Sequence, residues 1–289
     1  MEIQGISCAK LNLFLKVTKR RPDGFHELQT LFLPVTSPAD RITIEFDGAP
    51  GVRVRSNHPG LPENLENIAG RAALAYAETA GITPRFDIFI DKQIPVAAGM
   101  GGGSANAGTV LRLCDAQVRA VPQTELAELA LTLGADVPFF LAPRLAAASG
   151  VGEIFDYPQG EFAPPPLLIV NPCFPVSAKW AYQHLLPERI GEDSRHRLEH
   201  IVQALRVGDA AMLAENLHND LAFALYEKFP LLRLLKEFMC RNGALNAEVT
   251  GSGSTMFAVC RTKESMRQLK TALEERFSPA VLRLWEYCS

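Results

Sequence analysis

The first half of the chain alternates between segments of two kinds. In some, apolar and polar residues take turns over a few positions, which is typical of half-buried β-strands. In others, apolar residues return every three or four positions, which is typical of amphipathic helices. The predicted strands cover residues 11–17, 28–35, 41–46 and 85–90, and the predicted helices cover residues 67–80, 107–118 and 124–133. This mixture indicates an α+β architecture.

A cluster of prolines separates this half from the rest of the chain. Four prolines fall within residues 157–166, where neither a helix nor a central strand could continue, so a domain boundary is expected there. We therefore predict one domain at residues 1–158 and a second, a small α+β sandwich, at residues 159–289. The predicted strands of the second domain are 167–170, 248–250, 257–260 and 280–284, and its predicted helices are 194–205, 210–225 with a break near Asn219, 230–239 and 264–277.

Composition narrows the class of protein. The 289 residues are 47% hydrophobic and 21% charged with a formal net charge of −3, which fits a globular chain and indicates no basic face for nucleic acid. The start of the chain lacks the apolar core of a signal peptide, and no apolar run reaches the roughly 18 residues of a membrane span. The six cysteines are scattered, so neither a disulfide framework nor a zinc site is expected. We expect a cytoplasmic protein without nucleic-acid or membrane partners.

Residues 99–103 contain four glycines in five positions, and a predicted helix begins close behind them, near Ser104. Glycines let the backbone approach a ligand, and the free N–H groups of a helix N-terminus bind phosphate. The loop lacks the Gly-Lys-Ser/Thr ending of a P-loop and the acid of the dinucleotide fingerprint. A flexible linker is the alternative, but linkers are not followed directly by an apolar helix. We expect a nucleotide-phosphate loop, with Pro95, Val96, Ala97, Ala98, Gly99, Met100, Gly101, Gly102, Gly103, Ser104 and Ala105 as its binding residues.

Two charged side chains stand alone in apolar surroundings. Lys10 lies in an apolar strand two residues before Asn12, and lysine is seldom buried without a partner, which favours a site lysine over a surface one. Asp136 is the single acid of residues 134–140, where it would be either a carboxylate held in a pocket or the cap of a helix or turn. With the glycine loop, these residues fit phosphoryl transfer, which depends mainly on positioning and charge stabilisation.

Other polar features are less specific. Residues 251–254 form a second glycine-rich loop, and the sequence leaves open whether it is a site or a plain turn. His196 and His200 have a spacing that zinc ligands can use, but they lack a third ligand, so a solvated helix face is expected. A Gly-x-Ser-x-Gly elbow is absent from the sequence, which excludes the usual serine hydrolases.

Four motifs, in order, resemble those of the GHMP small-molecule kinases. They lie at residues 9–26, 94–107, 134–140 and 249–257. The first motif resembles the corresponding motif of one branch of this family. The members of that branch phosphorylate the 2-hydroxyl of cytidine diphosphate methylerythritol in non-mevalonate isoprenoid synthesis. The resemblance implies two domains, an N-terminal ribosomal-protein-S5-like domain and a C-terminal ferredoxin-like α/β sandwich. It also implies ATP as the phosphate donor and Mg²⁺ carried by the nucleotide, with no metal ligand from the chain.

The same resemblance implies roles for individual residues. Asp136 would be the catalytic base and Lys10 its charged partner, which also helps to fix the substrate hydroxyl. Asn67 and Lys92 would lie near the adenosine of ATP. The cytosine is expected between two aromatic rings, with His26 reading its edge; Phe25 is one ring, and Tyr182 is chosen over the nearby Trp180 for the other. The expected acceptor-binding residues are Asn12, Phe25, His26, Tyr182, Gly253 and Ser254.

Two positions depart from the family pattern. Ala105 stands where the family usually has a second serine, which puts a direct bond between the protein and Mg²⁺ in doubt. Gly108 lies early in a predicted helix, where glycine costs about 1 kcal/mol relative to alanine. Two alternatives remain: a sibling kinase acting on homoserine or mevalonate, and a non-catalytic nucleotide sensor on the same fold. The presence of both Lys10 and Asp136 argues against the sensor.

Overall fold

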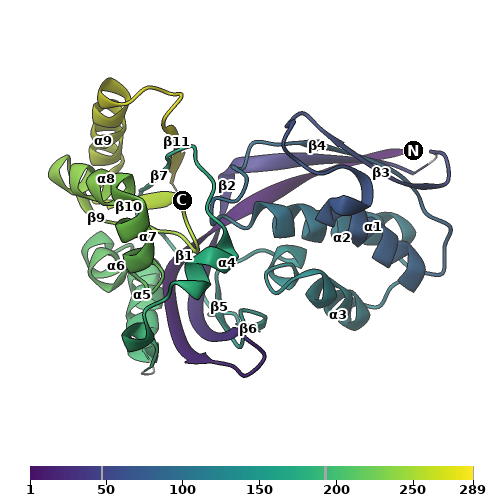
Figure 1. The fold of residues 1–289 in the computed structure, drawn as a ribbon, viewed down its shortest axis with the longest axis horizontal. Coiled ribbons are helices and arrows are strands. Elements are labelled where there is room, and N and C mark those ends of the chain that lie inside the picture. Colours follow the sequence, from purple (N-terminus) through teal and green to yellow (C-terminus); the bar gives the residue numbers. More distant parts are fainter. Residues whose placement is uncertain (47, 192–193, 289) are drawn as a thin grey trace. The chain divides into compact units, whose positions relative to one another are not determined.

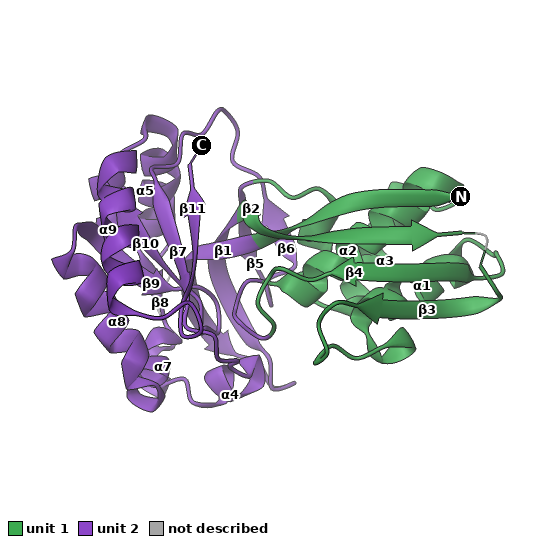
Figure 2. Ribbon diagram, turned by 90° about the horizontal axis from the view of Figure 1, so that it is seen from above, with its two compact units in different colours: residues 1–9, 34–96, 101–144 green, residues 10–33, 97–100, 145–289 purple. Residues whose placement is uncertain are grey.

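The computed structural model describes residues 1–46, 48–191 and 194–288, and within it the chain forms two compact units. Unit 1 consists of Met1–Ala9, Pro34–Val96 and Gly101–Arg144, and unit 2 of Lys10–Leu33, Ala97–Met100 and Leu145–Ser289 (Figure 2). Two long strands and the glycine loop pass from one unit into the other. The units therefore differ from the sequential division at residue 158 that the proline cluster predicts.

Unit 1 is a sheet with helices packed on one face (Figure 1). Strand β4 pairs antiparallel with β2 and parallel with β3, in the order β3-β4-β2-β1. Alternate apolar residues of β2 and β4, such as Ile42 and Ile88, join Tyr76 and Leu111 of the helices in one buried core. The elements are β1 (Glu2–Arg20), β2 (His26–Glu45), β3 (Gly51–Ser56), η1 (Asn64–Glu66), α1 (Ile68–Thr79), β4 (Arg85–Asp91), α2 (Gly102–Val118), α3 (Gln123–Leu133) and η2 (Pro138–Leu141), with the second part of β1 and the first part of β2 in unit 2.

The structure confirms the three predicted helices of this half, with one shifted start. Helix α2 begins at Gly102, two residues before Ser104 and five before residue 107. The predicted strands at 28–35 and 41–46 form the single strand β2, whose residues 30–32 pair with β5 and whose residues 41–45 pair with β4. A Cβ on Gly108 would lie 2.6 Å from Cβ of Phe140, so close packing of α2 on η2 accounts for this glycine.

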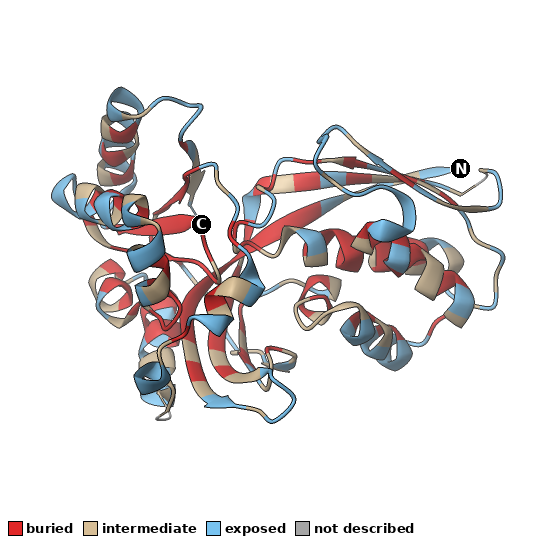
Figure 3. Ribbon diagram, viewed as in Figure 1, coloured by how far each residue is buried: buried red, intermediate tan, exposed pale blue. Residues whose placement is uncertain are grey.

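Unit 2 contains a four-stranded antiparallel sheet in the order β11-β7-β10-β9. Every residue of β7 and β10 is buried, because both faces of this sheet are covered (Figure 3). Leu235 of α8 and Leu269 of α9 belong to its main core. The elements are β5 (Ala146–Ser149), β6 (Ile154–Asp156), β7 (Leu167–Asn171), α4 (Ala178–Gln183), η3 (Pro187–Arg189), α5 (Arg195–Val207), α6 (Ala210–Asn216), β8 (His218–Asn219), α7 (Ala222–Lys228), α8 (Pro230–Arg241), β9 (Ala244–Val249), β10 (Met256–Cys260), α9 (Lys263–Arg276) and β11 (Arg283–Tyr287).

The predicted elements of the second half are largely confirmed. The break expected near Asn219 is real: Asn219 lies in the short strand β8, which pairs in parallel with β1 and separates α6 from α7. The last strand begins at Arg283, so the predicted range of 280–284 is displaced. Among the described helices, none combines the length and the apolar character that crossing a bilayer requires.

Candidate active site

The second part of the glycine loop, in unit 1, opens helix α2. Gly101 is the N-cap residue, with φ of 70° and ψ of 18°, a left-handed conformation that favours glycine. Ala105 donates its backbone N–H to the Gly101 carbonyl at 2.8 Å, which closes the first helical turn. The N–H groups ahead of Ala105 have no partner within the helix. Free N–H groups at a helix N-terminus can bind an anion. The side chain of Ala105 is fully buried and has no polar atom to offer one.

The first part of the loop, in unit 2, packs against the second glycine-rich loop. Gly99 has φ of 78°, and a Cβ at this position would lie 2.2 Å from the Thr250 carbonyl oxygen. Thr255 donates its backbone N–H to the Ala98 carbonyl at 3.2 Å. Thr250 and Thr255, the two residues that flank residues 251–254, therefore pack against the loop at residues 97–100. No local sequence pattern predicts this contact, because the two loops lie about 150 residues apart.

Lys10, on β1, is bonded to the same part of the glycine loop. Its backbone N–H donates to the Met100 carbonyl at 3.1 Å, and its Nζ donates to the Gly99 carbonyl at 3.1 Å. Nζ also donates to Oδ1 of Asn12 and lies 5.2 Å from the centre of the Phe32 ring. The side chain is only 5% exposed, so these contacts fix a buried ammonium group against the loop.

The orientation of the Asn12 amide follows from a chain of hydrogen bonds. The Phe14 carbonyl can only accept, so the Thr30 hydroxyl donates to it, at 2.6 Å. The Thr30 oxygen must then accept from Nδ2 of Asn12, at 2.8 Å, which turns Oδ1 toward Lys10. Thr250 holds the same residue by accepting its backbone N–H at 2.8 Å. Thr30 and Thr250 are thus supporting residues that the sequence analysis missed.

Asp136 lies in unit 1, in the turn between α3 and η2, and is half-buried. The N-cap residue of η2 is Val137, so Asp136 is not the N-cap of this helix. Phe139 and Phe140, which follow it, are fully buried and pack edge to face with ring centroids 5.0 Å apart. These anchors fix the backbone that carries the Asp136 carboxylate.

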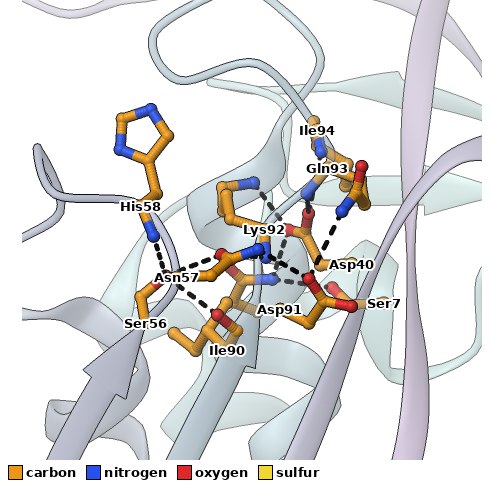
Figure 4. Close-up of polar contacts among 11 residues, drawn as sticks. Ser7, Asp40, Ser56, Asn57, His58, Ile90, Asp91, Lys92, Gln93 and Ile94 are labelled. Atoms are coloured by element: carbon orange, nitrogen blue, oxygen red, sulfur yellow. Dashed lines mark hydrogen bonds and ion pairs between the residues drawn. The ribbon is translucent and has the colours of Figure 1, made fainter.

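The two residues expected near adenosine both make buried polar contacts within unit 1. Asn67 caps α1: its side chain accepts the Ala69 N–H at 3.0 Å and donates to the Pro62 carbonyl at 2.9 Å. Lys92 donates from Nζ to Oδ2 of Asp40 at 2.6 Å, in the network of Figure 4. Burial lowers the pKa of the Lys92 ammonium, and the Asp40 carboxylate opposes that change. Asp40 is fully buried and was also missed from the sequence.

The aromatic residues expected at the cytosine lie in unit 2. The rings of His26 and Tyr182 stack with centroids 5.5 Å apart, and Phe25 is 62% exposed. Trp180 is engaged elsewhere, because the Lys228 ammonium lies 4.1 Å from its ring centre and the His184 ring lies 4.4 Å away. Burial, with a smaller contribution from the Arg20 charge, lowers the pKa of His26.

Ser254 and Gly253, two further residues expected to bind the acceptor, are packed within unit 2. Ser254 is fully buried, and its hydroxyl donates to the Phe174 carbonyl. A Cβ on Gly253 would lie 3.1 Å from the Val249 side chain. In the described residues, no group of three or more His, Cys, Asp or Glu side chains is arranged to hold a metal ion.

The chain was compared with known protein families and with proteins of known activity. Residues 67–143 match the family GHMP kinases N terminal domain, and residues 201–279 match GHMP kinases C terminal. A 4-diphosphocytidyl-2-C-methyl-D-erythritol kinase of Geobacter metallireducens is 39% identical over 262 residues, covering 90% of this chain and 89% of the relative. The same enzyme of Syntrophotalea carbinolica is 39% identical over 273 residues, covering 93% of each chain.

The chain belongs to the 4-diphosphocytidyl-2-C-methyl-D-erythritol kinase family of GHMP kinases. The crystal structure of a 4-(cytidine 5'-diphospho)-2C-methyl-D-erythritol kinase has a TM-score of 0.81 and 35% identity, and the match covers 98% of each chain. The two-domain α+β fold of the GHMP kinases is therefore confirmed. A homoserine kinase from Cytophaga hutchinsonii has a TM-score of 0.75 at 21% identity, covering 100% of this chain and 94% of that one, and shares the fold alone.

Proposed function

We propose that this protein transfers the γ-phosphate of ATP to the 2-hydroxyl of 4-diphosphocytidyl-2-C-methyl-D-erythritol, in the non-mevalonate route to isoprenoid precursors. The observation that carries the proposal is the bond from Lys10 Nζ to the Gly99 carbonyl. It places a buried cation on the backbone of the loop that is expected to hold the nucleotide phosphates. The names of the relatives at 39% identity support the choice of acceptor.

Asp136 and Lys10 have different roles in the proposed reaction. The Asp136 carboxylate takes the proton of the 2-hydroxyl as the new O–P bond forms, and the bond between the γ-phosphorus and the bridging oxygen breaks to release ADP. The Lys10 ammonium orients the hydroxyl and stabilises the negative charge that develops. Such general-base catalysis contributes about 10²- to 10⁴-fold. Charge stabilisation by a fixed cation in a buried site adds to it.

The backbone N–H groups at the start of α2 bind the nucleotide phosphates in this proposal, assisted by Ser104. Mg²⁺ carried by the nucleotide would neutralise phosphate charge, and Ala105 would offer it no hydroxyl. The protein is proposed to work in the cytoplasm. All six cysteines are free thiols, which suits a reducing compartment.

Phe25 and Tyr182 hold the cytosine in this proposal, and His26 reads its edge. Exposure of Phe25 leaves an aromatic face available for a base. Tyr182 is favoured over Trp180 because it already contacts His26, whereas Lys228 covers the Trp180 ring. Stacking on an aromatic side chain is worth about 1–3 kcal/mol per base in single-strand nucleic-acid binders.

The test is ADP release from ATP with a panel of acceptor alcohols. The cytidyl acceptor should be phosphorylated far faster than homoserine or mevalonate. Asp136→Asn should lower kcat about 10²- to 10⁴-fold and leave the dissociation constant of ADP unchanged. Equal rates with all three alcohols would favour a sibling kinase, and nucleotide binding without turnover would favour the sensor.

A further inference from the structure

Asp40 is a fully buried carboxylate to which the comparisons and the sequence motifs assign no role. It accepts four hydrogen bonds within unit 1, in the network of Figure 4. Oδ1 accepts the backbone N–H groups of Gln93 at 2.7 Å and Ile94 at 2.8 Å. Oδ2 accepts Nζ of Lys92 at 2.6 Å and Nδ2 of Asn106 at 2.8 Å. Four donors fill the acceptor capacity of one carboxylate.

These donors lie on both sides of the glycine loop. Lys92, Gln93 and Ile94 come directly before residues 95–105, and Asn106 comes directly after them. One carboxylate therefore fixes both ends of the loop. Glycine loses more conformational freedom on ordering than any other residue, so a loop of this composition depends on its ends for a defined shape.

Asp40 also makes the placement of Lys92 possible. A Cβ on Gly102, the first residue of α2, would lie 3.0 Å from Lys92 Nζ. A cation is unfavourable at a helix N-terminus, where the helix dipole is positive. The adjacent carboxylate compensates for this charge and keeps the ammonium group packed against the loop backbone.

We propose that Asp40 is a positioning residue for the nucleotide: by holding Lys92–Ile94 and Asn106 together, it presets the phosphate loop for ATP. The inference rests on the proposed role of residues 95–105 in binding nucleotide phosphates. A preset loop binds more tightly because less conformational entropy is lost on binding. Asp40 should therefore affect ATP affinity and leave the acceptor and the chemical step unaffected.

Asp40→Asn is the direct test. All four surrounding groups are donors, so the new amide NH₂ faces another donor in either orientation. We expect the dissociation constant of ADP to rise about tenfold, with a parallel rise in the KM of ATP. The KM of the cytidyl acceptor and kcat at saturating ATP should stay close to those of the wild type.

Asn106→Ala and Ser7→Ala form a matched pair that decides the question even if Asp40→Asn fails to fold. Nδ2 of Asn106 donates both to Asp40 and, at 3.0 Å, to Oγ of Ser7. Asn106→Ala removes the bond to Asp40 and should weaken ADP binding about threefold. Ser7→Ala leaves that bond in place and should not change ADP affinity.

ADP affinity is measured by calorimetry without any acceptor, and melting temperatures are recorded alongside. If Asp40→Asn and Asn106→Ala lower the melting temperature but bind ADP as the wild type does, Asp40 only stabilises the fold and the inference is wrong. If Ser7→Ala weakens ADP binding as much as Asn106→Ala, the effect does not run through Asp40, which also overturns it. Wild-type protein that binds no ADP would overturn the inference and the proposed function together.

Discussion

Lys10 in unit 2 and Lys92 in unit 1 are buried to a similar degree but contact different parts of the glycine loop and its flanks. Lys10 is 5% exposed and donates to two neutral oxygens, those of Asn12 and Gly99. Lys92 is 9% exposed and donates to the Asp40 carboxylate. The bond to the Gly99 carbonyl places the Lys10 ammonium group on the first part of the glycine loop. Asp40 instead ties Lys92 to the backbone N–H groups of Gln93 and Ile94, which precede the loop. We therefore assign Lys10 to the proposed reaction and Lys92 to the shape of the loop.

The largest expected effect tests the Lys10 side of this comparison. Lys10→Met keeps the length and apolar stem of the side chain and removes the charge. We expect kcat to fall about 10²- to 10³-fold, because a fixed cation near the reacting phosphate is lost. The dissociation constant of ADP should change little. Steady-state kinetics and calorimetry measure both, and a variant that turns over normally would show that Lys10 takes no part in the reaction.

Lys92→Met tests the other side and should act on stability. It leaves the Asp40 carboxylate buried without its cation, and breaking a buried ion pair in this way costs about 3–5 kcal/mol. We expect a large fall in the midpoint of urea unfolding. At a temperature where the variant is folded, kcat at saturating ATP should remain near the wild-type value. A midpoint close to that of the wild type would show that the Asp40–Lys92 pair does not stabilise unit 1.

The surroundings of Lys10 could be predicted in part from the sequence, whereas the ion pair between Asp40 and Lys92 could not. The reason is the distance between the partners along the chain. Lys10 stood out because its neighbours are apolar and Asn12, its partner, is two residues away. Asp40 lies 52 residues before Lys92, and no local pattern links them. The contact between Gly99 and Thr250 is more distant still. Most helices were found because their periodicity is local, whereas β3, β5 and β6 are short and gave no recognised pattern.

Thr30 offers a smaller and more specific test of how Lys10 is held. Thr30→Val removes the hydroxyl that fixes the Asn12 amide, so the amide can turn its NH₂ group toward the ammonium. We expect kcat to fall about tenfold, which corresponds to the loss of one buried hydrogen bond. Thr30→Ser keeps the hydroxyl and should retain most of the activity. Equal activity of the two variants would mean that the orientation of Asn12 does not matter for turnover.

The smallest expected effect concerns the pH dependence of acceptor binding. Burial and the Arg20 charge lower the pKa of His26 from its usual 6.5, so the ring stays neutral until the pH falls below that lowered value. If neutral His26 reads the cytosine, the KM of the cytidyl acceptor should rise only as the pH falls through this lowered pKa, in more acidic solution than a histidine of ordinary pKa would require. Arg20→Gln removes one of the two causes and raises the pKa of His26. The rise in KM should then begin at a higher pH, while the KM of ATP shows no such displacement. The lysine comparison predicts this independence, because neither the Asp40–Lys92 pair nor the Gly99–Lys10 bond involves His26. An equal displacement in the KM of ATP would show that the acceptor and nucleotide sites are coupled through a shared group.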